Sequence, residues 1–107
     1  MCGIYGEVAL TPGRQPDRAA VTQSGAAMLH RGPDDNDLYV TDQVALGLRR
    51  LSIIDVSGGR QPLFNEDRTV AVVCNGEIYN FRELRAALTT AGHHFRTGSD
   101  AEVLVHL

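Results

Sequence analysis

The sequence has little cysteine, no long apolar run and no excess of either charge. Its 107 residues include two cysteines, Cys2 and Cys74, which are too few for the disulfide framework of a small secreted domain. The longest apolar runs fall far short of the roughly 20 residues that cross a bilayer. Residues 1–20 also lack the pattern of a secretory signal. We therefore expect a cytoplasmic protein with free thiols and no membrane partner.

Charged residues make up 21% of the chain and apolar residues 43%, which is ordinary for a globular domain. The ten basic and thirteen acidic side chains are spread evenly and give no basic patch for nucleic acid. No phosphate-binding or dinucleotide-binding glycine motif is present. The four histidines show no metal-ligand spacing: His30, His93, His94 and His106. The sequence predicts no nucleic-acid partner, no bound metal and no cofactor in this segment.

Strand-like and helical patterns alternate along the chain. The patterns predict strands at 2–9, 38–41, 44–48, 69–74 and 93–97, extended chain at 49–56, turns at 42–43 and 57–59, and helices at 17–29 and from Asn80 to Gly92. The β-branched run at 69–74 favours a strand that is covered on both faces, which also predicts a buried thiol at Cys74. Asn80 with Glu83, and Ser99 with Glu102, have the spacing of helix capping boxes.

The last predicted helix follows Ser99 and has eight residues before the sequence ends. A helix this short does not hold in water without a partner. We interpret the chain as the N-terminal part of a longer protein that folds poorly by itself. A natural short domain, with this helix packed on its own sheet, is the alternative.

Five short motifs contain the residues that could take part in catalysis or binding. In chain order they are Met1-Cys2-Gly3-Ile4, His30-Arg31-Gly32-Pro33-Asp34, Arg50-Leu51-Ser52-Ile53-Ile54-Asp55, Asn75-Gly76-Glu77-Ile78-Tyr79-Asn80 and Gly98-Ser99-Asp100. Removal of Met1 would leave Cys2 with a free α-amine. Such an amine has a pKa of about 7.7–8.0 and could accept the proton of a thiol, so one residue would supply nucleophile and base. Taken alone, Cys2 is better explained as a small apolar residue of the first strand.

The order and spacing of the five motifs resemble the glutaminase domain of glutamine-dependent asparagine synthetases, over essentially all of residues 1–107. This family belongs to the class II glutamine amidotransferases. The resemblance implies an α+β fold of the N-terminal-nucleophile hydrolase type, an αββα sandwich of antiparallel sheets that is incomplete in this chain. It also implies that 1–107 is the N-terminal part of the glutaminase domain. The remainder of that domain and a synthetase domain that uses ATP and Mg²⁺ would be absent.

The activity that the resemblance implies is hydrolysis of the side-chain amide of L-glutamine. Cys2 would attack the amide, form a γ-glutamyl thioester and release ammonia, which the synthetase domain of the full-length protein would use to make asparagine from aspartate. The segment alone would be inactive, and the full protein could form a homodimer. Two alternatives stay open: a relative that amidates a sugar or peptide carboxylate, and a short binding module without catalysis.

The resemblance also assigns residues to the glutamine carboxylate. Arg50 matches the family position, and a planar guanidinium suits a carboxylate because it donates two parallel hydrogen bonds. Leu51 and Ile53 would contribute backbone contacts or pocket wall. Arg49 precedes Arg50 in a strand, so alternation puts the two side chains on opposite faces. We interpret Arg49 as a solvated surface charge.

Four further residues match the family pattern. Asn75 and Gly76 would donate hydrogen bonds to the oxyanion that forms during attack, although Asn-Gly is also a common turn. Asp100 would hold the glutamine ammonium, with Glu77 as its neighbour. The alternatives are an acid in the first turn of a helix for Asp100 and a turn residue for Glu77. For residues 30–34 we expect a role in loop architecture that shapes the pocket, without chemistry.

Overall fold

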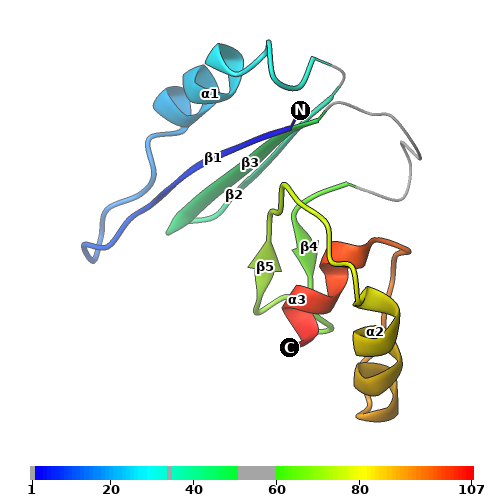
Figure 1. Ribbon diagram of the computed structural model, residues 1–107. Coiled ribbons are helices and arrows are strands. Elements are labelled where there is room, and N and C mark those ends of the chain that lie inside the picture. The colour runs from blue at the N-terminus through cyan, green and yellow to red at the C-terminus, as the bar shows by residue number, and fades with distance from the viewer. Residues whose placement is uncertain (1, 34, 51–59) are drawn as a thin grey trace.

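The structure is a computed structural model that describes residues 2–33, 35–50 and 60–107. It is a mixed α/β fold with antiparallel sheets, as the sequence predicts at this coarse level (Figure 1). The elements in chain order are β1 (Gly3–Val8), α1 (Arg18–Ala27), β2 (Asp35–Val40), β3 (Val44–Arg50), β4 (Leu63–Phe64), β5 (Ala71–Val72), α2 (Phe81–Thr90), the 3₁₀ helix η1 (Asp100–Glu102) and α3 (Val103–His106). The predicted extended chain at 51–56 and the turn at 57–59 lie outside the described residues.

The larger sheet has three antiparallel strands with β3 in the centre, in the order β1-β3-β2. β2 and β3 form the predicted hairpin, closed by a hydrogen bond of 2.7 Å from the Thr41 N–H to the Val44 carbonyl. β1 pairs with the other edge of β3 over its whole length, which confirms the predicted first strand. β3 is therefore held on both edges, and its side chains Ala45 and Leu48 are fully buried.

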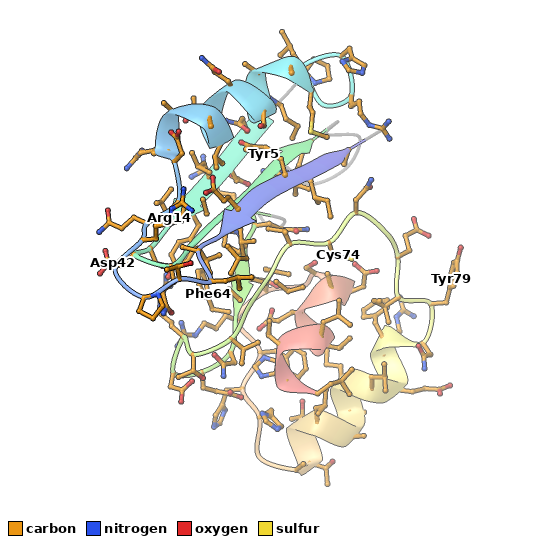
Figure 2. All side chains as sticks on the ribbon, turned by 90° about the vertical axis from the view of Figure 1, so that its left-hand side faces the viewer. Tyr5, Arg14, Asp42, Phe64, Cys74 and Tyr79 are labelled. Atoms are coloured by element: carbon orange, nitrogen blue, oxygen red, sulfur yellow. The ribbon has the colours of Figure 1, made fainter. Side chains whose placement is uncertain are left out.

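Helix α1 covers one face of this sheet (Figure 1). Asp17 caps the helix, because its carboxylate accepts the N–H of Ala20 at 3.1 Å. Figure 2 shows Tyr5 between α1 and the sheet, where its ring packs against Gly25 and Gly47. A Cβ added at Gly25 would lie only 2.6 Å from the ring. The two glycines thus allow α1 to lie close over β1 and β3.

The short β4–β5 pair contacts the opposite face of the sheet through Tyr39 and Phe64, whose ring centroids are 5.1 Å apart in an edge-to-face arrangement. The prediction of a covered strand at 69–74 is wrong. Only β5 forms there, and Val70 is 46% exposed. Pairing stops because β4 offers only two residues. Next to it, the side-chain amide of Gln61 takes the place of a strand and bonds both the N–H and the carbonyl of Cys74, at 2.6 and 3.2 Å.

The helix that begins after Asn80 is confirmed. It ends before Gly92, which has a φ of 103°, and the N–H of His93 closes the end with a bond of 3.0 Å to the Leu88 carbonyl. The capping-box prediction is wrong at both places, since neither Asn80 nor Ser99 makes a side-chain capping bond. No helix in the described part of the chain is long and apolar enough to cross a membrane.

The predicted strand at 93–97 does not form, because carboxylates satisfy its backbone instead of a neighbouring strand. Glu66 accepts the N–H of His94 at 3.1 Å. Glu102 accepts the N–H groups of Arg96 and Thr97, at 2.7 and 2.8 Å. The segment is therefore tied to side chains of the β4–β5 loop and of η1.

Hydrogen bonds lower the pKa values of both Glu66 and Glu102. Burial works to raise the pKa of Glu102, but hydrogen bonds from Thr97 and from the Arg96 backbone outweigh it and lower the pKa. Hydrogen bonds from its own backbone N–H and from His93 lower the pKa of Glu66 to about 2. Both acids are therefore carboxylates at neutral pH and can accept the bonds that hold this segment.

The confinement of Tyr5 can be tested by adding one methyl group at Gly47. We expect Gly47→Ala to lower the free energy of unfolding by about 1–3 kcal/mol, because the new Cβ would overlap the ring. Gly98→Ala is the matched control, since nothing lies within 4 Å of its Cβ position. Urea unfolding followed by circular dichroism gives both values. Equal midpoints for the two variants would show that the ring is not confined.

Candidate functional site

The start of β1 and the end of β3 meet at one end of the sheet. Gly3 pairs with Arg49, so one further step in this antiparallel register sets Cys2 opposite Arg50. Cys2 is half-buried, and Arg50 is 8% exposed. Two of the predicted site residues, far apart in the sequence, are therefore brought to the same place by backbone pairing alone.

Asn75 joins Cys2 at this end of the sheet. Its side-chain Nδ2 donates a hydrogen bond of 3.0 Å to the Cys2 carbonyl, and Gly76 follows with its backbone exposed. The structure thus places three predicted residues together, one thiol and two candidate hydrogen-bond donors. Cys74 lies close by, but it is half-buried and not the buried thiol that the sequence predicts.

Asp100 reaches the same loop from the first position of η1. Its Oδ2 accepts the N–H of Ile78 at 2.6 Å, which ties η1 to the chain just after Gly76. Glu77 lies between these residues and is exposed. One oxygen of Asp100 is therefore used to hold the loop, whereas the carboxylate has a second oxygen that can accept other bonds.

Arg50 has a carboxylate partner that the sequence analysis missed. Its Nη2 lies 3.6 Å from Oδ2 of Asp37, and both side chains are largely buried. The same Oδ2 accepts the backbone N–H of Gln61 at 3.1 Å. The side-chain amide of Gln61 in turn bonds the backbone of Cys74. Asp37 was detectable in principle: extending the predicted hairpin pairs it with Leu48, on the face that Arg50 also occupies. Gln61 carries no signal in the sequence.

The alternation of the two arginines is confirmed, but Arg49 is not a solvated surface charge. It lies on the face covered by α1, and its Nε donates a bond of 2.8 Å to the carbonyl of Gly25. The loop at 30–33 packs beside it. Gly32 is buried against the strand, and a Cβ there would lie 2.6 Å from both the Arg49 carbonyl oxygen and the Arg50 nitrogen. Only glycine lets this loop support the end of β3, which agrees with its expected architectural role.

Leu51 and Ile53, the predicted pocket wall, lie outside the described residues. A shallow pocket of about 380 Å³ does occur at the other end of the sheet, between residues 9–15 and the hairpin turn. Arg14 and Asp42, which line it, mark that end in Figure 2. It contains none of the predicted site residues.

Comparisons with known proteins point to one family. The family model described as a glutamine amidotransferase domain matches residues 1–107. Asparagine synthetase [glutamine-hydrolyzing] 1 of Arabidopsis thaliana is 47% identical over 107 residues, and the Zea mays asparagine synthetase [glutamine-hydrolyzing] is 45% identical over the same length. Asparagine synthetase [glutamine-hydrolyzing] 2 of Bacillus subtilis is 43% identical over 109 residues. All of this chain is covered, but it spans only 18%, 18% and 14% of these relatives.

The contact between Arg50 and Asp37 predicts a cost for removing the negative charge. We expect Asp37→Asn to lower the free energy of unfolding by about 1–3 kcal/mol, because an amide cannot neutralise a largely buried guanidinium. Asp42→Asn is the control, since Asp42 is exposed in the hairpin turn. Urea unfolding of both variants measures the difference, and an Asp37→Asn variant as stable as the control would show that the pair contributes nothing.

Proposed function

The chain belongs to the glutamine amidotransferase domain family, and from this membership we propose that Cys2 hydrolyses the side-chain amide of L-glutamine. The observation that carries the proposal is the hydrogen bond from Asn75 to the carbonyl of Cys2 itself. It holds a neutral hydrogen-bond donor on the backbone of the residue that we propose as the nucleophile. Amide attack requires such a donor, because negative charge develops on the carbonyl oxygen.

In the proposed reaction, removal of Met1 frees the α-amine of Cys2, which accepts the proton of its own thiol. The thiolate attacks the amide carbon of glutamine and forms a tetrahedral intermediate. The C–N bond then breaks, the protonated amine returns its proton to the leaving nitrogen, and ammonia departs from a γ-glutamyl thioester. Water attacks the thioester, which gives glutamate and restores the thiol.

Asn75 and Gly76 are the proposed oxyanion donors. The Asn75 side chain has two N–H donors. The one that donates to the Cys2 carbonyl fixes the orientation of the amide. The second remains for a substrate oxygen. Gly76 lies where the chain has left β5, so its backbone N–H is not committed to strand pairing. Together they would supply two donors from one turn.

Arg50 is the proposed partner of the glutamine α-carboxylate, with Leu51 and Ile53 as backbone contacts or pocket wall. Asp37 favours this role because it anchors the guanidinium from one side, and a planar guanidinium can donate to a second carboxylate from another edge. Asp100 and Glu77 are the proposed acceptors for the α-ammonium. The bond from Ile78 to Asp100 would hold the ammonium and oxyanion sites in one loop.

We further propose that residues 1–107 form the N-terminal part of a glutaminase domain, whose αββα sandwich the remainder of a longer chain completes. The relatives are named glutamine-hydrolysing asparagine synthetases, and this chain spans less than a fifth of their length. In the longer protein, a cytoplasmic enzyme, a synthetase domain would bind ATP and Mg²⁺ and pass the ammonia to aspartate. A homodimer is compatible with this proposal.

The nucleophile is tested in the whole protein with Cys2→Ala. We expect glutamate formation from glutamine to fall to background, because no other group supplies the thioester. Synthesis from ammonium chloride should persist. Cys74→Ala is the matched control, as its thiol lies near the site but has no proposed role, and should retain glutamine hydrolysis.

Two results would overturn this assignment: glutamine hydrolysis that survives Cys2→Ala, or a full rate in protein that keeps Met1. The acceptor is read in the same assay from amide-¹⁵N-labelled glutamine with ATP and Mg²⁺. Label in asparagine supports aspartate as the acceptor. Label that enters only an added sugar or peptide carboxylate would refute aspartate as the acceptor and leave the proposed role of Cys2 unchanged.

The oxyanion role predicts a specific kinetic defect for Asn75→Ala. We expect kcat for glutamine hydrolysis to fall about 10²–10³-fold with little change in KM, because the lost donor acts on charge that exists only in the transition state. Asn80→Ala is the control, since the Asn80 side chain makes no capping bond at the start of α2. A rise in KM at constant kcat would instead assign Asn75 to ground-state binding.

A further inference from the structure

Three side chains from separate parts of the sequence converge outside the candidate site. Glu66 comes from the loop between β4 and β5, His93 from the end of α2, and His106 from α3. Oε1 of Glu66 lies 2.8 Å from Nδ1 of His93 and 2.9 Å from Nδ1 of His106. The three candidate ligand atoms all lie within 4.8 Å of one another.

The imidazole of His106 is the unusual member of this cluster. Its side chain is 1% exposed, and Nδ1 is a buried nitrogen without a hydrogen-bond partner in the part of the chain that the structure describes. The close approach to Glu66 does not have the geometry of a hydrogen bond. A buried polar atom left in this way is costly, and it normally indicates a missing partner.

Both ring nitrogens of His106 face a carboxylate, and a neutral ring has only one N–H to donate. Nε2 of His106 lies 3.4 Å from Oε1 of Glu102, and a carboxylate can only accept. With the proton on Nε2, the lone pair of Nδ1 is left beside the carboxylate oxygen of Glu66. These two electron-pair donors, 2.9 Å apart, repel each other unless a cation, either a proton or a metal ion, lies between them. A carboxylate behind an imidazole is also the usual support of a metal-bound histidine.

The three ligand atoms lie close enough for small side-chain rotations to bring them around one ion. Zn²⁺ has ligand bonds of about 2.0–2.2 Å in a tetrahedron, which sets neighbouring ligand atoms about 3.4 Å apart. Two imidazoles and one carboxylate form a donor set typical of divalent transition metals. We propose that Glu66, His93 and His106 bind a divalent transition-metal ion such as Zn²⁺, with Glu102 orienting His106.

The sequence prediction of no bound metal rested on local spacing, which cannot detect a cluster built from three distant segments. An ion here would clip the β4–β5 loop to the end of α2 and to α3. Because α3 continues directly from η1, the clip would also secure the element that carries Asp100. The site is therefore structural, and its existence does not depend on the proposed glutamine chemistry.

The test is metal binding by the whole protein after removal of metals with a chelator. We expect one Co²⁺ per chain with a visible d–d absorption band, and a higher melting temperature with Zn²⁺. Glu66→Gln and His93→Ala should each weaken Co²⁺ binding at least tenfold. His94→Ala is the matched control. The His94 imidazole is exposed, and the backbone N–H that donates to Glu66 remains in the variant.

Circular dichroism confirms that each variant is folded before titration. His93 supplies a second test if Glu66→Gln does not fold, because the His93 side chain is 36% exposed and tolerates truncation. Absence of Co²⁺ binding in the wild-type protein would overturn the proposal, and the cluster would then be a network of polar contacts without a metal. Equal binding by the wild type and both ligand variants would overturn it as well.

Discussion

The antiparallel register between β1 and β3 is the constraint on which the rest of the site depends. It sets Gly3 against Arg49, and so brings the thiol of Cys2 to the level of Arg50. A slip of one residue would turn Arg50 toward α1 and remove it from Asp37. Because β2 holds the second edge of β3, the register is fixed from both sides. The backbone, more than any side-chain contact, sets Cys2 beside Arg50.

The C-terminal half of the chain is organised differently. Its two strands contain two residues each, and polar side chains supply the bonds that strands supply in the larger sheet. Gln61 bonds the backbone of Cys74, and Asp100 bonds the backbone of Ile78. Glu66 and Glu102 accept the backbone N–H groups of His94, Arg96 and Thr97. The position of Asn75 and Gly76 therefore follows from side-chain amides and carboxylates, which are sensitive to single substitutions.

The sequence predicts well those elements whose signals are local. The helix that follows Asp17, the hairpin turn and the helix end at Gly92 each depend on a few adjacent residues. The strands expected at 69–74 and 93–97 failed because β propensity does not reveal whether a partner strand exists. Motif order correctly grouped Cys2 with Asn75. It could not reveal Asp37, whose position follows from strand register, and it could not reveal Gln61 or the Glu66 cluster, because these residues lie in none of the motifs.

The ring of Tyr5 has a consequence for how this domain can change. It fills the space that side chains at Gly25 and Gly47 would otherwise occupy, so the three positions share one fixed volume. A larger residue at either glycine becomes acceptable only after the tyrosine has been replaced by something smaller. Evolution across this interface must therefore proceed through coordinated substitutions, and attempts to redesign α1 should vary the three positions as one set.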